Sequence, residues 1–386
     1  MPESASQVTK TNRLHIYPLT SLRFFAAFLI FVLHASNHNF FPSSYLHHFD
    51  LSKSVCFFFV LSGFVLSYAY DNTHICLRTF YRARLLRIWP LTVASLVFVF
   101  LFLPSSLYLP LESSIFSSAA VLTTHIFCIQ AFFPISSFYF GFNAVSWSIS
   151  AELFFYALFP FVIRLKTSKL LLCTISYTLF LLFFASYLNR FELEFFSSSN
   201  YDFIDINGLL YINPLARLPE FLIGVLAFKV FSSPYYNKFF AQYARLKLRI
   251  KLFYYLLDVL IMFLLLSFAF GRSLSFTTRL ELLDFSILQL NAAIFFAIII
   301  LMCISSFGLI SKILSLRLFV SLGNLSFSFY LLHQPIMIRA SQVGSINIGG
   351  FPLFHSSFLS VLFYSLLISL LFHYFIEKRL IALIRS

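Results

Sequence analysis

Long apolar runs separated by short polar stretches recur along the chain from residue 19 to residue 375. Each run is about 20 residues long, the length that an α-helix needs to cross the hydrocarbon core of a bilayer. The runs occupy 19–37, 54–70, 88–109, 147–163, 170–188, 212–228, 252–270, 286–306, 319–338 and 354–375. The pattern predicts an all-α integral membrane protein, a bundle of about ten transmembrane helices.

One further apolar stretch, residues 115–133, is long enough to span but is rich in Ser and Thr and contains His125 and Gln130. Counting it as a span would invert every later helix and place a basic cluster outside the cell. That cluster is Arg245, Lys247, Arg249 and Lys251. Because Lys and Arg collect in cytoplasmic loops, we predict instead a re-entrant or interfacial segment near 115–133, on the external side.

Composition and charge agree with this topology. Of the 386 residues, 60% are hydrophobic and only 11% charged, whereas a soluble domain carries about 25% charged residues. Most of the 27 Lys and Arg fall in alternate loops, so the net charge of +13 is explained by the cytoplasmic excess of basic residues rather than by a nucleic-acid partner. We expect a multi-pass protein of the inner (plasma) membrane, with a cytoplasmic tail at 1–18, a transmembrane domain at 19–378 and a cytoplasmic tail at 379–386.

Ionisable side chains inside the spans are the candidates for chemistry, because each costs about 2.5–3.5 kcal/mol or more in hydrocarbon. Arg23 and His34 lie eleven residues apart in the first run. They therefore share one face of a helix, about 16 Å apart along its axis. The pair indicates either a functional site or a snorkelling arginine with a hydrogen-bonded interfacial histidine.

Two later residues are expected near the outer ends of their spans. Glu152 follows the start of the fourth run, which places it at the predicted depth of His34, where a carboxylate could orient an imidazole base. A structural ion pair is the alternative. His333 lies in the ninth run and shares a face with Ser326 and Tyr330 by helical spacing, for catalysis or for hydrogen bonding between helices. Arg217 and Glu220, three residues apart, favour a structural or substrate-orienting ion pair.

Arginines cluster before the third run, at Arg82, Arg84 and Arg87. Guanidinium groups bind phosphate through paired donors, so the cluster favours an anionic, phosphate-bearing donor. Positive charge that only sets the topology is the alternative. The sequence contains no Walker loop, dinucleotide fingerprint or metal-ligand spacing, and we predict no metal site and no tightly bound cofactor.

Five motifs in order resemble the membrane-bound acyltransferase 3 family, bacterial-type glycan O-acyltransferases, from about residue 16 to 378. They are Arg23 with His34, the Phe57–Phe64 stretch with its Leu-Ser-Gly element, the Arg82–Pro90 block, the Ser146–Glu152 segment, and Ser328–His333. The resemblance implies a ten-helix bundle that takes an acyl group, most simply acetyl, from cytoplasmic acyl-coenzyme A (acetyl-CoA) and delivers it to a sugar hydroxyl of a cell-surface or lipid-linked glycan, such as lipopolysaccharide.

The same resemblance implies that His34 is catalytic and that Arg23, Arg82, Arg84 and Arg87 bind the donor. We add Glu152, as the residue that orients His34, and His333 as further catalytic candidates. A transporter or flippase of a glycan precursor is the competing interpretation, because intramembrane Arg, Glu and His also mark transport pathways. The paired halves of many transporters are not visible in the sequence. Neither the glycan, the acyl chain nor the oligomeric state can be deduced from it.

Overall fold

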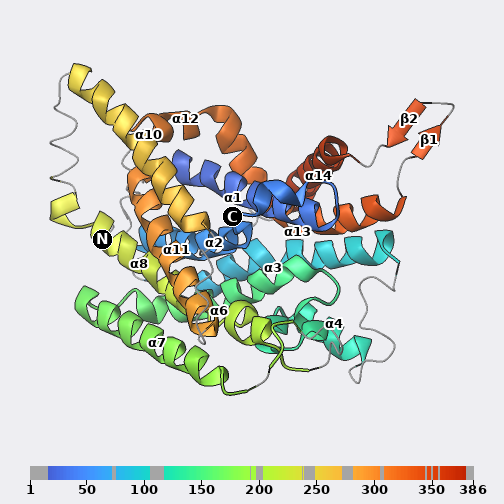
Figure 1. The fold of residues 1–386 in the computed structure, drawn as a ribbon, viewed down its shortest axis with the longest axis horizontal. Coiled ribbons are helices and arrows are strands. Elements are labelled where there is room, and N and C mark those ends of the chain that lie inside the picture. Colours follow the sequence, from blue (N-terminus) through green and yellow to red (C-terminus); the bar gives the residue numbers. More distant parts are fainter. Residues whose placement is uncertain are drawn as a thin grey trace, which may run out of the picture.

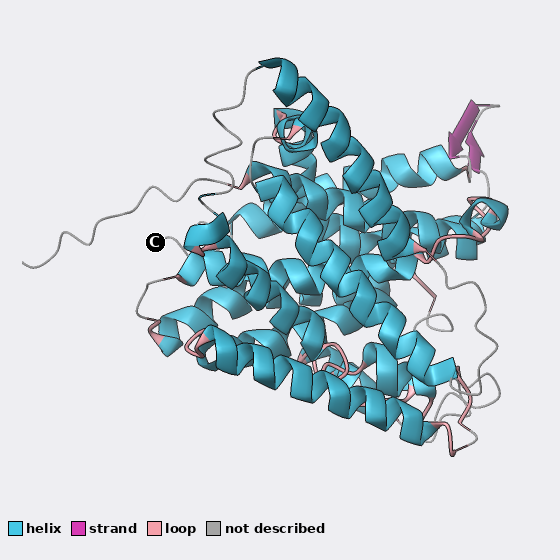
Figure 2. Ribbon diagram, turned by 60° about the vertical axis from the view of Figure 1, so that its left-hand side comes forward, coloured by secondary structure: helices cyan, strands magenta, loops and turns pink. Residues whose placement is uncertain are grey.

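The computed structural model describes most of the chain. The described residues are 16–71, 75–104, 117–191, 193–196, 203–236, 238, 248–271, 281–304, 308–343, 346–348, 351–354 and 357–379. Helices make up nearly all of this structure, with a single small pair of strands (Figure 2). The all-α integral membrane architecture is confirmed. The predicted tails lie mostly outside the described residues.

A helix lies at each of the ten predicted spans (Figure 1). These are α1 (Tyr17–Asn37), α2 (Ser54–Tyr70), α3 (Leu77–Phe102), α6 (Trp147–Val162), α7 (Thr167–Leu188), α8 (Leu218–Phe231), α10 (Leu248–Phe270), α11 (Glu281–Ile304), α13 (Arg317–Val343) and α14 (Phe358–Phe372).

Within the described residues, eight helical segments are long and apolar enough to cross a membrane. The two exceptions are α8, which has only 14 residues, and α13, which has 27 residues but is the least apolar of the ten long helices.

Short elements connect the long helices. They are η1 (Ser43–Leu46), η2 (Leu51–Lys53), α4 (Ser118–Ile126), η4 (Gln130–Phe132), α5 (Ser136–Tyr139), η5 (Ala144–Ser146), η6 (Gly208–Ile212), α12 (Leu309–Leu314) and η7 (His373–Glu377). Strands β1 (Ile346–Ile348) and β2 (Phe351–Phe354) form an antiparallel hairpin between α13 and α14, an addition to the all-helical prediction.

The predicted interfacial segment near 115–133 is broken into short pieces. Its main helix, α4, has nine residues, about 14 Å at 1.5 Å per residue, less than half of the hydrocarbon thickness. His125 is buried there and binds the carbonyl oxygen of Phe138 at 2.8 Å through Nε2. Burial lowers its pKa to about 4, so His125 is neutral at pH 7 and serves as a structural link.

The centre of the bundle is α2, the most buried of the apolar helices, whereas α7, α10 and α14 are mostly exposed. Helix α2 packs along α8, and α1 packs along α13. Gly63 and Gly224 make the first contact possible, because a Cβ atom on Gly63 would overlap the carbonyl oxygen of Phe221, and one on Gly224 that of Val60. Small residues allow this close approach of helix backbones.

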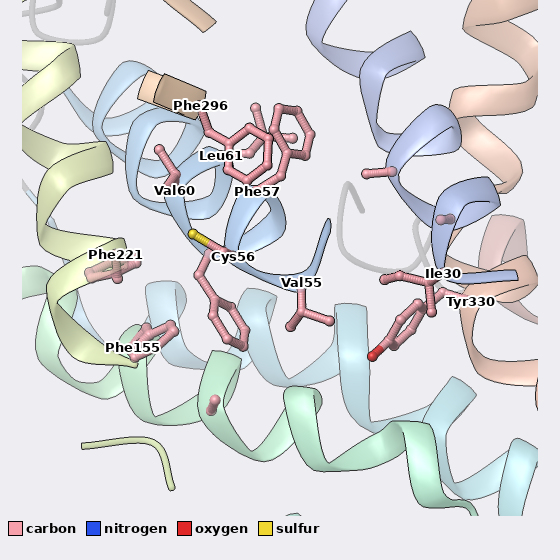
Figure 3. Packing of buried hydrophobic residues seen from close by; sticks show 14 of the residues in the cluster. Ile30, Val55, Cys56, Phe57, Val60, Leu61, Phe155, Phe221, Phe296 and Tyr330 are labelled. Atoms are coloured by element: carbon pink, nitrogen blue, oxygen red, sulfur yellow. The ribbon is translucent and has the colours of Figure 1, made fainter. Parts of the chain in front are cut away.

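Aromatic rings fill the space around α2 (Figure 3). Phe155 of α6 stacks on Phe221 of α8 with ring centroids 4.9 Å apart, and Phe59 of α2 meets Phe155 edge-on at 5.1 Å. Such pairs add about 0.5–1.5 kcal/mol each beyond the burial of their surface. They hold α2, α6 and α8 in fixed positions around the functional residues.

Candidate active site

The first of two neighbouring cavities is lined by arginines. It measures about 590 Å³ and lies among α1, α2, α3, α6, α13 and the η7 turn. Its charged lining residues are Arg23, Arg84, Arg87, Glu152, Glu377 and Lys378, with His373 beside them. We call this space the arginine cavity; its cationic side chains outnumber its carboxylates.

Two of the arginines are available to a ligand. Arg23 and Arg87 line the arginine cavity together with the carboxylates of Glu152 and Glu377. Among the described residues, neither guanidinium takes part in a hydrogen bond or a close ion pair. Two like charges that line one cavity repel each other, so an anion bound between them would relieve this repulsion.

Arg84 is held by its neighbours. Its Nη2 donates to the Tyr70 hydroxyl at 3.1 Å, and its guanidinium lies over the rings of Tyr70 and Tyr156 at 5.4 and 5.8 Å. Arg82, in contrast, is exposed and does not line the cavity. Of the four arginines that the sequence analysis assigns to the donor, the structure brings together Arg23, Arg84 and Arg87.

The second cavity, of about 760 Å³, contains His34. We call it the histidine cavity. Its lining includes aromatic rings and polar side chains; the rings are those of Phe140, Trp147, Phe195, Phe196, Tyr211 and Tyr330, and the polar groups are His34, Asn37, Asp50, Ser52, Asn207 and Gln334. No Lys or Arg is among these lining residues, in contrast to the arginine cavity.

His34 pairs with His333, which lies 299 residues away in the sequence. The Nδ1 atom of His34 is 2.8 Å from Nε2 of His333, and the two rings are stacked with centroids 5.0 Å apart. His333 is fully buried, and its Nδ1 contacts the carbonyl oxygens of Tyr330 at 2.7 Å and Phe329 at 3.2 Å. The pairing follows from the packing of α1 along α13.

These contacts determine which nitrogen carries each proton. A carbonyl oxygen can only accept, so Nδ1 of His333 must donate. In a neutral ring, Nε2 of His333 is then an acceptor, and Nδ1 of His34 must donate to it. The remaining nitrogen of His34, Nε2, therefore has a free lone pair, as a general base requires.

The two cavities are adjacent. Val55 of α2 and Tyr330 of α13 line both of them. The Tyr330 hydroxyl donates to the carbonyl oxygen of Val145 at 3.1 Å and lies 2.8 Å from Oγ of Ser148. The arginine cavity and the histidine cavity thus share part of their walls at Val55 and Tyr330.

Comparison with known proteins gives the family. A family model described as an acyltransferase domain matches residues 16–374, nearly the whole chain. The chain belongs to the acyltransferase 3 family. The resemblance to this family that the five ordered motifs indicated is thereby confirmed.

One curated relative of this acyltransferase 3 family member is "Acyltransferase MdmB" from Streptomyces mycarofaciens. It is 35% identical over 156 residues, 38% of this chain and 39% of the relative. The similarity thus spans about two fifths of the curated relative. No solved structure matches the chain.

The sequence analysis expected Glu152 beside His34, but in this acyltransferase 3 family member the two residues do not lie together. Glu152 lines the arginine cavity and accepts a short hydrogen bond from the Tyr156 hydroxyl one turn further along α6. Glu152 therefore lines a different cavity from His34. Here His333, rather than Glu152, contacts His34.

The expected pair of Arg217 and Glu220 is confirmed, with Nη1 and Oε1 3.1 Å apart and both side chains buried. The Arg217 guanidinium also lies 4.6 Å from the ring centre of Tyr211, one of the rings of the histidine cavity. The ion pair therefore holds part of the cavity wall. This agrees with the structural or substrate-orienting ion pair that the spacing favours.

His373 and Glu377 were missed by the sequence analysis. His373 Nδ1 and Glu377 Oε2 are 2.8 Å apart, and the Ser328 hydroxyl donates to the same carboxylate oxygen at 3.0 Å. Both residues line the arginine cavity. A histidine and a glutamate four residues apart at the end of the last apolar run were the signal that could have found them.

Proposed function

We propose that this protein is a membrane O-acyltransferase that moves an acetyl group from cytoplasmic acetyl-CoA to a sugar hydroxyl of a cell-surface or lipid-linked glycan. The observation that carries the proposal is the contact between two unlike cavities: one lined by arginines, the other by His34 with a free lone pair. Family membership supports acyl transfer as the type of reaction.

In the proposed reaction the phosphates of coenzyme A bind Arg23 and Arg87, and the thioester extends to Val55 and Tyr330. Nε2 of His34 takes the proton of the sugar hydroxyl while the hydroxyl oxygen attacks the thioester carbonyl. The C–S bond then breaks, and the proton passes from the His34 imidazolium to the departing sulfur. His333 accepts from Nδ1 of His34 throughout and stabilises the charged intermediate.

The lining of the histidine cavity supports a sugar as the acceptor. A sugar ring has C–H groups on its faces and hydroxyls at its rim. Aromatic walls with a few amide, hydroxyl and carboxylate groups complement such a molecule. Trp147 and Tyr211 supply ring faces, and Asn207 and Gln334 supply polar groups.

Acetyl-CoA turnover by the purified protein in detergent, measured as release of free coenzyme A in the presence of glycan extract, tests the function. We expect release that depends on both the protein and the extract. A transporter or flippase would leave acetyl-CoA intact, and that result would contradict the proposal.

The arginine cavity carries a separate prediction about the donor. Hydrogen bonds to charged groups contribute about 1.5–3 kcal/mol each, so Arg87→Ala should weaken acetyl-CoA binding about ten-fold or more. Arg82→Ala, an exposed change on the same helix, is the matched control and should bind normally. Equal affinities of both variants in a titration with acetyl-CoA would leave Arg87 with no role in donor binding.

The proposed topology places both termini and the arginine cavity on the cytoplasmic side of the plasma membrane. In a cysteine-free background, a single cysteine at the exposed Asn189, just after α7, should react with an impermeant thiol reagent added outside the cells. One at the exposed Ser232, just after α8, should react only in inverted vesicles. Labelling of both from one side would overturn the ten-span arrangement.

A further inference from the structure

Two buried side chains form part of the wall that the two cavities share. Val55 and Tyr330 line both cavities, and their side chains are 5% and 6% exposed. Figure 3 shows Val55 on α2 and the Tyr330 ring beside Ile30 of α1. The contacts of the Tyr330 hydroxyl with Ser148 and Val145 hold the Tyr330 ring in this position.

The position of this wall has a consequence for the donor, one that rests on the proposed function. An acyl group bound through the arginine cavity must meet the base and the acceptor, which occupy the histidine cavity. The acyl chain is then the part of the donor that lies against Val55 and Tyr330. Both present apolar surface there, the methyl groups of Val55 and a ring packed on Phe58 with centroids 5.8 Å apart.

We infer that Val55 sets the size of the acyl group that the protein transfers. The wall is close-packed, so every added methylene of the acyl chain has to displace part of it. An apolar pocket discriminates between chains that differ by one methylene by about 10–200-fold. Val55 is the better candidate for the size limit, because Tyr330 is also fixed by its hydrogen bonds and its carbonyl oxygen holds His333.

The test is a competition between donors in inverted membrane vesicles from cells that make the protein. Acetyl-CoA, propionyl-CoA and butyryl-CoA are supplied in equal amounts, and the acids released from the glycan by mild alkali are measured by mass spectrometry. The wild type should transfer mainly acetyl. Val55→Ala should raise the butyryl-to-acetyl ratio about ten-fold or more, and Val55→Leu should lower the propionyl-to-acetyl ratio.

Val60→Ala is the matched control, because Val60 is buried on the same helix but is not among the lining residues of either cavity. Val60→Ala should lower the amount of folded protein without changing the butyryl-to-acetyl ratio. An unchanged ratio in Val55→Ala, or equal transfer of all three groups by the wild type, would overturn the inference while leaving the proposed function standing. Vesicles that transfer no acyl group from any donor would overturn both.

Discussion

His34→Gln is expected to lower acetyl transfer by about 10²–10⁴-fold, the usual contribution of a positioned general base. A sugar hydroxyl is a weak nucleophile at pH 7, and the free Nε2 lone pair of His34 is well placed to take its proton. Glutamine keeps a polar side chain of similar reach but cannot accept the proton. The measurement is the initial rate of acetyl transfer to glycan in inverted vesicles supplied with acetyl-CoA.

Two comparisons make this prediction specific. His48→Gln, the same change at an exposed histidine, should have normal activity. Acetyl-CoA binding by His34→Gln should also remain normal, because His34 lies in the histidine cavity and the arginines do not contact it. Near-normal turnover of His34→Gln would show that the imidazole has only a structural role.

The second large effect is expected from His333→Ala, which should lower kcat about 10²-fold with little change in the KM for acetyl-CoA. His333 is a positioning residue, because its Nδ1 is held by the Tyr330 carbonyl and its Nε2 determines the tautomer of His34. Without it, His34 can carry its proton on either nitrogen, and an incorrect tautomer cannot act as the base. His333→Gln, whose amide oxygen can accept from His34, should recover part of the rate.

The double variant separates positioning from general destabilisation. If the two histidines act as one unit, His34→Gln with His333→Ala should be about as slow as His34→Gln alone. If the double variant lost activity by the product of the two single-variant factors, the two residues would contribute independently, and the paired arrangement would then be wrong. The amount of protein that elutes as a single species in detergent provides the check on folding.

The spans could be predicted from the sequence because apolar runs of the required length leave little choice in a bilayer. Helix ends were less accurate. Helix α3 begins at Leu77, eleven residues before the predicted 88, because the arginine-rich stretch consists of good helix formers. Helix α8 begins at Leu218 rather than 212, since Pro214 disfavours a helical conformation in the residue before it.

The residues of the candidate site could be singled out in the sequence, but their arrangement could not. His34 and His333 each stood out as polar groups in apolar runs, yet their contact depends on how α1 packs along α13, which no local pattern encodes. Glu152 was assigned the wrong neighbour because its distance from the start of a run does not say which other helices it faces; it bonds Tyr156 and lines the arginine cavity. The role of Val55 could not have been found at all, since a valine in an apolar helix carries no signal until the cavities on its two sides are known.

The most direct measurement of the central claim is the mass of the surface glycan from three otherwise identical cell populations: one without the protein, one with the wild type and one with His34→Gln. The account predicts that wild-type glycan gains the mass of an acetyl group, that mild alkali removes this mass as expected for an ester, and that the other two glycans lack it. Identical glycans in all three populations, or a full acetyl signal with His34→Gln, would contradict acyl transfer by this site.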